Sequence, residues 1–271
     1  MIIHIIIKHF ISNVTHRHVP IARITYLCTN FTEHNMGNDF FRFKFFTINQ
    51  DKCAMKVGTD GVLLGAWTET GNALKIADIG TGTGLIAIML AQKSKASIIG
   101  IEIDSDSAMQ AKENMSSTLW KDRLTVVQDD IKNYYLNHKS EFDLIVSNPP
   151  FFKENTKGYS ERRNIARHTE GLGFDTLTRA ASFMLKENGR FCVIIPATSA
   201  TEFISEAIKH KLNLTIRTDI ITKPGAPAKR VIMEFSKNTF GFNTTKSSIL
   251  ILSENGMKSQ DYLNLTSDFY L

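Results

Sequence analysis

Short apolar runs alternate with longer segments of mixed polarity from residue 74 onward. Five of these runs predict buried strands, at residues 74–80, 96–104, 123–130, 141–148 and 189–196. The segments between and after them predict helices at residues 84–94, 106–118, 174–185 and 199–211. Ser105 precedes the second helix and is a candidate N-cap.

This alternation indicates an α/β fold. Strands that alternate with helices form a parallel sheet covered by helices on both faces. Two further strands, 212–221 and 230–236, are separated only by the loop 222–229, which predicts a hairpin and an antiparallel final strand. We therefore expect a single Rossmann-like domain with a mostly parallel, seven-stranded sheet.

The first 35 residues differ in composition from the rest. They contain five of the eight histidines, and their apolar start lacks the charged beginning and the cleavage site of a signal peptide. The chain takes on a globular pattern only from Met36. We expect 1–35 to be an extension outside the fold, 36–73 a short segment leading into the core, 74–237 the core, and 238–271 a C-terminal strand and tail that pack on it.

Composition narrows the protein class. Hydrophobic residues make up 42% and charged residues 22%, as in ordinary soluble domains. The three cysteines, Cys28, Cys53 and Cys192, form no C-x-x-C pair, which favours a reducing compartment and argues against a zinc site or disulfide framework. No apolar run approaches the ~20 residues needed to span a bilayer. We expect a cytoplasmic protein without a metal centre.

Charge is concentrated in one loop. The whole chain carries +5, which is compatible with nucleic acid binding without requiring it. Residues 151–168 hold five basic side chains against two acidic ones; the basic residues are Lys153, Lys157, Arg162, Arg163 and Arg167. This segment could equally be a solvated loop, as most charge runs are.

A glycine-rich turn follows the first predicted strand. In "ADIGTGTGL" (77–85), Gly80, Gly82 and Gly84 permit positive φ and close approach of a ligand to the backbone. A phosphate-binding P-loop needs Lys and then Ser or Thr after its last glycine, and Leu85 follows here instead. A dinucleotide fingerprint needs its third glycine at position 85. The sequence therefore excludes both motifs.

Acidic residues mark the ends of three successive strands. Asp78 precedes the glycines, Glu102 ends the second strand, and Asp129 and Asp130 end the third. A carboxylate at the position of Glu102 can accept both ribose hydroxyls of a nucleoside. Each acid also has a simpler interpretation, since Asp78 could be a turn residue and Asp129 or Asp130 a helix N-cap.

The fourth strand runs into "NPPF" (148–151). Proline gives no ladder hydrogen bond and holds the preceding residue extended, so the strand must stop at Ser147 and present Asn148 at its carboxyl end. A stiff segment that carries an amide and an aromatic ring suits the placement of a planar substrate.

Together these features resemble the class I S-adenosylmethionine-dependent methyltransferases that act on amino groups of planar systems. The resemblance implies that the turn holds the methionine end of the cofactor, that Glu102 holds the ribose, and that Asp130, rather than its neighbour Asp129, meets the adenine. The turn residues concerned are Asp78, Gly80, Thr81, Gly82 and Gly84. The catalytic tetrapeptide would be Asn148, Pro149, Pro150 and Phe151.

This tetrapeptide suggests a mechanism. The lone pair of an exocyclic adenine nitrogen is delocalised into the ring, which makes the nitrogen a poor nucleophile. If Asn148 Oδ1 and the Pro149 carbonyl each accept one N–H, the lone pair can point at the sulfonium methyl group. Phe151 would stack on the extruded base.

Three longer stretches resemble the bacterial tRNA1(Val) adenine-37 N6-methyltransferases. They are "FRFKFFTINQDKCAMKVGTDGVLLGAW" (41–67), "ARHTEGLGFDTL" (166–177) and "KPGAPAKRVIMEF" (223–235). The resemblance implies that Thr59 and Asp60 lie beside the methionine end of the cofactor, and a role as N-cap of the following helix is compatible with that position.

A tRNA anticodon stem-loop is the implied partner of a monomeric enzyme. Its unpaired bases can be splayed onto aromatic side chains. The candidate phosphate contacts are Lys153, Arg162, Arg163, Arg167, Lys223, Lys229 and Arg230. The alternatives are a glutamine methyltransferase acting on release factors, an rRNA or DNA methyltransferase, and a degenerate fold used as a binding module.

Overall fold

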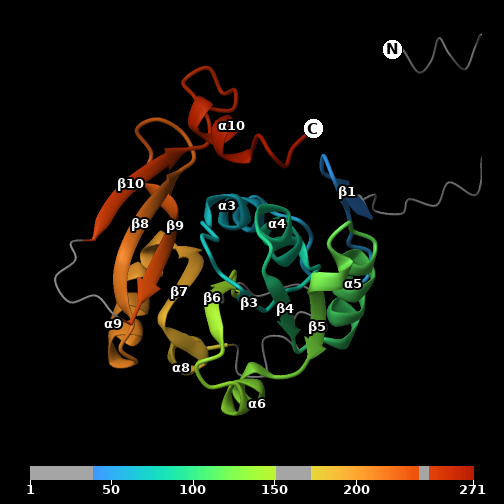
Figure 1. Ribbon diagram of the computed structural model, residues 1–271. Coiled ribbons are helices and arrows are strands. Elements are labelled where there is room, and N and C mark those ends of the chain that lie inside the picture. Colours follow the sequence, from blue (N-terminus) through green and yellow to red (C-terminus); the bar gives the residue numbers. More distant parts are fainter. Residues whose placement is uncertain (1–38, 151–171, 238–243) are drawn as a thin grey trace, which may run out of the picture. The chain divides into compact units, whose positions relative to one another are not determined.

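The computed structural model describes residues 39–150, 172–237 and 244–271, and its centre is an eight-stranded sheet (Figure 1). The strand order is β10-β8-β9-β7-β6-β3-β4-β5. The strands, in chain order, are β3 (Lys75–Ile79), β4 (Ser97–Glu102), β5 (Leu124–Gln128), β6 (Phe142–Ser147), β7 (Leu185–Pro196), β8 (Asn213–Ile221), β9 (Ala228–Ser236) and β10 (Thr245–Leu250).

Only β9 runs against its neighbours, since it pairs antiparallel with both β7 and β8. The mostly parallel α/β sheet and its closing hairpin are therefore confirmed. The sheet has one strand more than the seven counted in the alternating pattern, because β10 pairs parallel with β8 at the edge. Four of the six residues of β10 are exposed, so its sequence "TKSSIL" lacks the apolar run that marks a buried strand.

Helices cover both faces of the sheet, as Figure 1 shows. Successive side chains of a strand point to opposite faces, so the continuous apolar runs bury both. In β6, for example, Leu144 and Val146 join the apolar cluster beneath α3 and α4, whereas Ile145 joins the cluster beneath α8 and α9. The helices are α3 (Thr59–Trp67), α4 (Leu85–Lys93), α5 (Ser105–Ser116), α6 (Ile131–Tyr134), α8 (Phe174–Met184), α9 (Ala200–Lys209) and α10 (Gln260–Thr266).

Helices α3 and α4 are apolar on nearly every side because both are buried on two faces. Beneath them lies the sheet, and outside them lie the small β1 (Phe40–Arg42) and β2 (Thr47–Asn49) hairpin and the C-terminal segment. Phe43 stacks on Tyr270 at a ring-centroid distance of 5.8 Å, and the Lys44 amide donates to the Phe269 carbonyl. The β1–β2 hairpin and the C-terminal segment thus form a second layer outside α3 and α4.

Two boundaries differ from the sequence-based expectation. The N-cap of α5 is Asp104 rather than Ser105, and its carboxylate accepts a hydrogen bond from the Ser107 amide at 2.8 Å. Strand β7 begins at Leu185, four residues earlier than the apolar run suggests. Short 3-10 turns occupy Lys121–Arg123, Tyr135–Asn137 and Ala197–Ser199.

In the part of the chain that is described, no helix is long and apolar enough to cross a membrane.

Candidate active site

The carboxyl ends of β6, β3 and β4 meet at one edge of the sheet. Ile79 at the end of β3 pairs in register with Ser147 of β6 on one side and with Ile101 of β4 on the other. From β3 the chain continues to β4 and β5, and β6 then lies on the opposite side of β3. Such a switch point is where open α/β sheets bind their ligands.

The glycine-rich turn leaves open space at this edge. Gly80 and Gly82 have φ of +72° and +55°, and a Cβ at either position would meet nothing within 4 Å. Gly84, with φ of +83°, is instead packed against α5, because a Cβ there would lie 3.2 Å from Met115 Cε and 3.5 Å from Ala111. Two glycines therefore keep a cradle open, and the third allows α5 to approach.

Asp78 is fully buried beneath this turn. Its Oδ2 accepts a hydrogen bond from Thr81 Oγ1 at 2.7 Å, while its Oδ1 has no hydrogen-bond partner. Burial raises the pKa of the Asp78 carboxyl to about 7. A buried carboxyl with one free oxygen and a raised pKa is suited to receiving a cationic group.

Glu102 lies on the neighbouring strand end. Its Oε2 accepts from the Gly82 amide at 2.9 Å and its Oε1 from the Asp104 amide at 3.1 Å. Burial raises the pKa of the Glu102 carboxyl, against the effect of these two amides. A carboxylate held in this way between the turn and the strand end presents oxygen acceptors for vicinal hydroxyls.

Of the two roles expected for Asp130, helix N-cap and contact with the cofactor adenine, the structure shows the first. It is the N-cap of α6 and accepts from the Lys132 amide at 2.9 Å. Asp129 donates its amide to the Glu102 carbonyl, which ties the β5 end to the same edge. Both acids are only half-buried.

Asn148 follows β6 and lies next to the turn. The hydroxyl of Ser147 donates to the Ile79 carbonyl at 2.9 Å, which fixes the end of β6 against the end of β3. Asn148 Oδ1 is buried and has no hydrogen-bond partner. Among described residues, the other buried side-chain oxygens without a partner are Asp78 Oδ1, Thr68 Oγ1 just after α3, and Gln92 Oε1 in the last turn of α4.

Helix α3 closes the site above Asn148. A Cβ on Gly61 would lie 3.9 Å from Asn148 Nδ2 and 3.2 Å from Leu85 Cδ2, so the helix approaches the strand end at a glycine. The N-cap of α3 is Gly58, which makes no side-chain capping bond. The expectation that Thr59 or Asp60 caps this helix was therefore wrong, because the helix begins at Thr59 itself.

Asp60 instead forms an ion pair with Arg230, whose Nε lies 2.7 Å from Asp60 Oδ2. Of the basic residues expected to contact phosphate, Arg230 is thus partly engaged, whereas Lys223 and Lys229 are exposed. All three belong to the β8–β9 hairpin, whose loop lies at the carboxyl edge of β8.

Several predicted site residues lie outside the described part of the chain. They are Phe151, Lys153, Arg162, Arg163 and Arg167.

Gly100 is a site-supporting residue that the sequence reasoning missed. It pairs with Asp78 in register, and a Cβ there would lie 2.8 Å from Thr81 Oγ1 and Cγ2. Only glycine leaves room for the threonine that bonds Asp78. A glycine within an otherwise apolar strand was the available signal.

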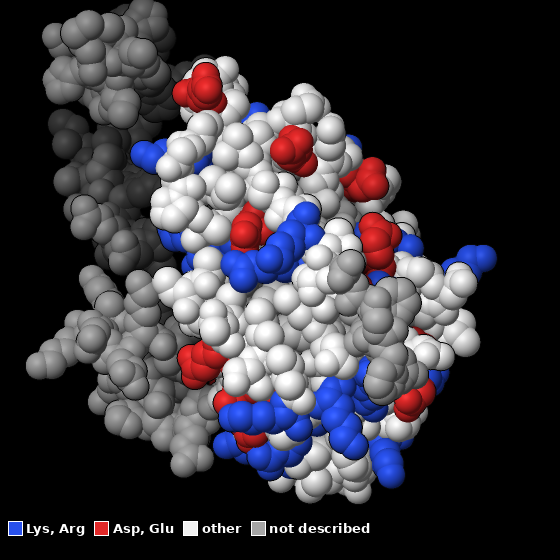
Figure 2. Space-filling model, turned by 90° about the vertical axis from the view of Figure 1, so that its left-hand side faces the viewer, with Lys and Arg blue, Asp and Glu red and all other residues white. Residues whose placement is uncertain are grey.

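On the face drawn in Figure 2, Lys and Arg gather away from this edge. Figure 2 shows Lys and Arg gathered at the lower end of the face that carries α9 and β8. Lys209 and Lys211 stand just before the first residue of β8, which is the edge opposite the carboxyl ends. Lys209 is also paired with Glu206 at 2.7 Å.

Comparisons with known proteins agree with this geometry. A family model, the methyltransferase small domain, matches residues 57–216. A solved structure, a predicted O-methyltransferase from Agrobacterium tumefaciens, superposes with a TM-score of 0.63 at 19% identity, over 78% of this chain and 96% of that one. At that identity the likeness shows the fold alone, and it confirms the Rossmann-like methyltransferase architecture.

Curated relatives are much more similar. The tRNA1(Val) (adenine(37)-N6)-methyltransferase of Phocaeicola vulgatus is 44% identical over 87% of this chain and 99% of its own length. Those of Trichodesmium erythraeum and Yersinia enterocolitica are 44% and 38% identical, covering 87% and 85% of this chain and 99% and 92% of their own lengths. The resemblance in the three long sequence stretches is thus confirmed, and the chain belongs to the family of tRNA1(Val) (adenine(37)-N6)-methyltransferases, which use S-adenosylmethionine.

Proposed function

We propose that this chain transfers a methyl group from S-adenosylmethionine to the N6 nitrogen of adenine 37 in tRNA1(Val). It would act as a cytoplasmic monomer on the anticodon stem-loop. The observation that carries the proposal is Asn148 Oδ1, a buried acceptor without a partner, at the strand end beside an open glycine turn. The names of the relatives supply the substrate.

The residues present fit the cofactor. Gly80 and Gly82 leave a cradle that a Cβ would narrow, and Asp78 Oδ1 is a free acceptor for the ammonium group of the methionine end. Glu102 would accept the ribose hydroxyls. When bound, S-adenosylmethionine supplies an electrophilic methyl group on a sulfonium centre.

The chain's own contribution to the chemistry is orientation. Asn148 Oδ1 and the Pro149 carbonyl would each accept one N–H of the adenine amine, which turns the nitrogen lone pair away from the ring. Pro149 and Pro150 hold these acceptors in place beforehand, and such positioning can be worth several kcal/mol. The amine nitrogen would gain positive charge as it takes the methyl group, with the demethylated cofactor as the leaving group, and it would then release a proton to water. No strong base is needed before the attack.

The anticodon loop suits this edge because its bases are already unpaired. Lys223 and Lys229 are exposed on the β8–β9 hairpin at the same edge as Asn148, which supports them as candidates for contact with the phosphates that flank the base. This placement favours them over the basic surface near α9.

The test is methyl transfer from labelled cofactor to separate pools of tRNA, rRNA, DNA and release factor, followed by nucleoside analysis. We expect N6-methyladenosine in tRNA1(Val) and none in an otherwise identical transcript with guanine at position 37. Label in release factor or rRNA, with none in tRNA, would overturn the proposal.

A further inference from the structure

One face of α5 lies between the glycine-rich turn and the segment that follows β2. Gln110, Ala111, Asn114 and Met115 point inward from this face, and Asn114 is completely buried. Ala111 and Met115 are the residues that pack against Gly84 of the turn. The remaining inward residues are polar, which is costly inside a protein unless their hydrogen bonds are satisfied.

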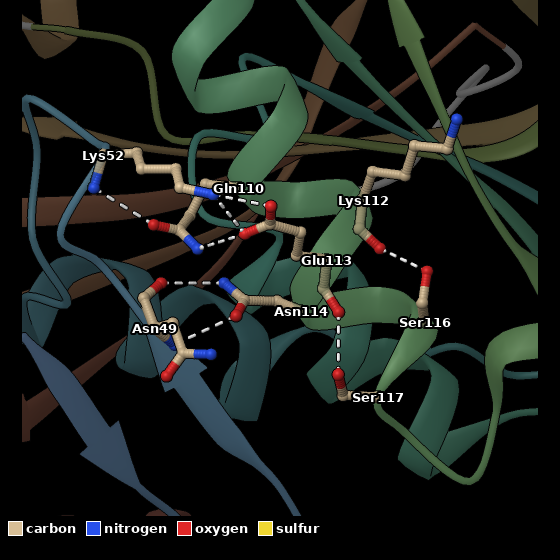
Figure 3. Close-up of polar contacts among 8 residues, drawn as sticks. All are labelled: Asn49, Lys52, Gln110, Lys112, Glu113, Asn114, Ser116 and Ser117. Atoms are coloured by element: carbon tan, nitrogen blue, oxygen red, sulfur yellow. Dashed lines mark hydrogen bonds and ion pairs between the residues drawn. The ribbon is translucent and has the colours of Figure 1, made fainter.

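Asn114 joins the two neighbouring segments through a single side chain, as Figure 3 shows for its contacts with Asn49. Its Oδ1 accepts from the Asn49 amide at 2.9 Å, and its Nδ2 donates to the Asn49 carbonyl at 2.9 Å. The same Nδ2 donates to the Thr83 carbonyl at 2.9 Å, between Gly82 and Gly84. The amide thus replaces a strand partner for Asn49 and fixes the turn at the same time.

Two further contacts hold the segment but do not touch the turn. Gln110 Oε1 accepts from the Lys52 amide at 3.1 Å, and Lys52 Nζ pairs with Glu113 at 2.6 Å (Figure 3). The Lys52–Glu113 pair is exposed, and such surface pairs contribute little to stability. Of these side chains, Asn114 is the one that bonds both to the segment after β2, at Asn49, and to the glycine-rich turn, at Thr83.

The segment continues directly toward the reacting groups. Cys53 is buried beside the Ser107 hydroxyl, and burial raises the pKa of its thiol to about 11, with Glu102 nearby. The Val57 amide then donates to Gln50 Oε1 at 2.7 Å, immediately before the N-cap of α3. The first turn of α3 lies over Asn148. A displacement at Asn49 would therefore be transmitted along one side of the cofactor site.

We propose that Asn114 is a positioning residue, which sets the affinity for S-adenosylmethionine by fixing segment 49–57 against the glycine-rich turn. This inference rests on the proposed function, because it takes that turn to be the cofactor site. Loss of the amide would leave the Asn49 amide and the Asn49 and Thr83 carbonyls without these bonds. The turn would then lose its tie to α5 at Thr83, between Gly82 and Gly84.

The test compares Asn114→Ala and the nearly isosteric Asn114→Asp with two control variants. Asn49→Ala leaves the bonds intact, since they involve only the Asn49 backbone, and Glu113→Ala removes the exposed pair. Kd for the cofactor, single-turnover rate at saturating cofactor, and Kd for tRNA are measured on each. We expect the Asn114 variants to bind the cofactor about tenfold or more weakly, with tRNA affinity unchanged and both controls near wild type. A folded Asn114 variant with unchanged cofactor affinity would overturn the proposal.

A measurement on the wild-type chain covers the case in which the Asn114 variants do not fold. Hydrogen exchange is followed with and without S-adenosylmethionine. Slower exchange on binding, both at residues 80–84 and at residues 49–57, supports the proposal. Protection of 80–84 alone contradicts it while leaving the proposed function intact, and a wild-type chain that does not bind the cofactor contradicts the proposed function itself.

Discussion

Carboxyl groups at the amino ends of the strands (the amino edge of the sheet) and at the carboxyl ends (the carboxyl edge) have pKa values shifted in opposite directions. At the amino edge, Asp143 accepts from Lys186 Nζ at 2.8 Å and from the amides of Leu74 and Lys75 at 3.0 and 2.9 Å. Burial alone would raise the pKa of Asp143, but these donors outweigh it and lower the pKa. At the carboxyl edge, burial raises the pKa of both Asp78 and Glu102.

The backbone at the two ends of the strands also differs, since it is engaged by a side chain at the amino edge and open at the carboxyl edge. At the amino edge, Lys93 Nζ donates to the carbonyls of Ala66 and Thr68 at 2.6 and 2.7 Å, which satisfies the C-terminal end of α3. At the carboxyl edge, the turn stands open at Gly80 and Gly82. The comparison teaches that the carboxylate of Asp143 at the amino edge is fully engaged by internal donors, while Asp78 and Asn148 at the carboxyl edge each keep one buried oxygen without a partner beside an open turn.

The largest effect should come from Asn148. Asn148→Ala removes an acceptor that acts mainly when the amine reorients, so the single-turnover rate should fall by about a hundredfold or more. Affinity for tRNA should change little, which filter binding checks. If the variant methylates at the normal rate but binds tRNA poorly, the strand end is a docking element and the comparison fails.

Glu102→Gln should produce the next largest effect. The substitution keeps the size of the side chain but replaces one acceptor oxygen with a donor, so calorimetry should show both the cofactor and its demethylated product binding about tenfold more weakly. NAD should not compete at the wild-type site. Competition by NAD at similar strength would show that this edge is not specialised for S-adenosylmethionine.

The matched change at the amino edge is Asp143→Ala. It leaves two strand amides and Lys186 without their acceptor, so the free energy of unfolding should fall by about 1–2 kcal/mol. Thermal unfolding measures this loss. Cofactor affinity and methylation rate should remain at wild-type values, and a selective loss of cofactor binding would remove the distinction between the two edges.

The smallest expected effect belongs to the exposed hairpin. Lys229→Ala should weaken binding to every tRNA by a few fold and reduce the slope of log affinity against log salt by about one unit. Lys209→Ala, at the opposite edge, is the control and should leave that slope unchanged. Equal effects of the two substitutions would indicate that RNA lies across both edges.

Local signals made much of this arrangement predictable from sequence. The glycine turn, the acids at successive strand ends and the stop before Pro149 each depend on neighbouring residues and strand order. Three details were not predicted: the pairing of the C-terminal strand within the central sheet, the role of Gly100 and the role of Asn114. Strand β10 is polar because it lies at an exposed edge of the sheet. Gly100 matters only through Thr81, a threonine nineteen positions earlier in the sequence. Asn114 acts through hydrogen bonds to Asn49 and Thr83, which lie 65 and 31 positions away.

The pairing of Asp60 with Arg230 was also beyond local reasoning, because 170 positions separate the two residues. Helix-start patterns suggested that Thr59 or Asp60 is a cap, yet the chain uses the carboxylate to hold the β8–β9 hairpin. Tertiary context decided the role of that side chain.

The protonation state of Asp78 is the most direct consequence of burial at the carboxyl edge. Its pKa rises from an ordinary 3.8 to about 7, so near pH 6 the carboxyl is protonated in the folded, cofactor-free chain. Folding then binds a proton that the unfolded chain has lost, and the free energy of unfolding should fall as pH rises from about 4 to about 7. A cationic ligand at Oδ1 reverses this preference by favouring the charged carboxylate.

Proton release during cofactor binding tests this account most directly. Calorimetric titration of the wild-type chain with S-adenosylmethionine at pH 6, in two buffers of different ionisation enthalpy, gives the number of protons exchanged. The account predicts release of up to about one proton per bound cofactor, because Asp78 must ionise to receive the ammonium group. Binding without proton release would show that Asp78 is already charged or does not meet the cofactor, and would contradict the central claim.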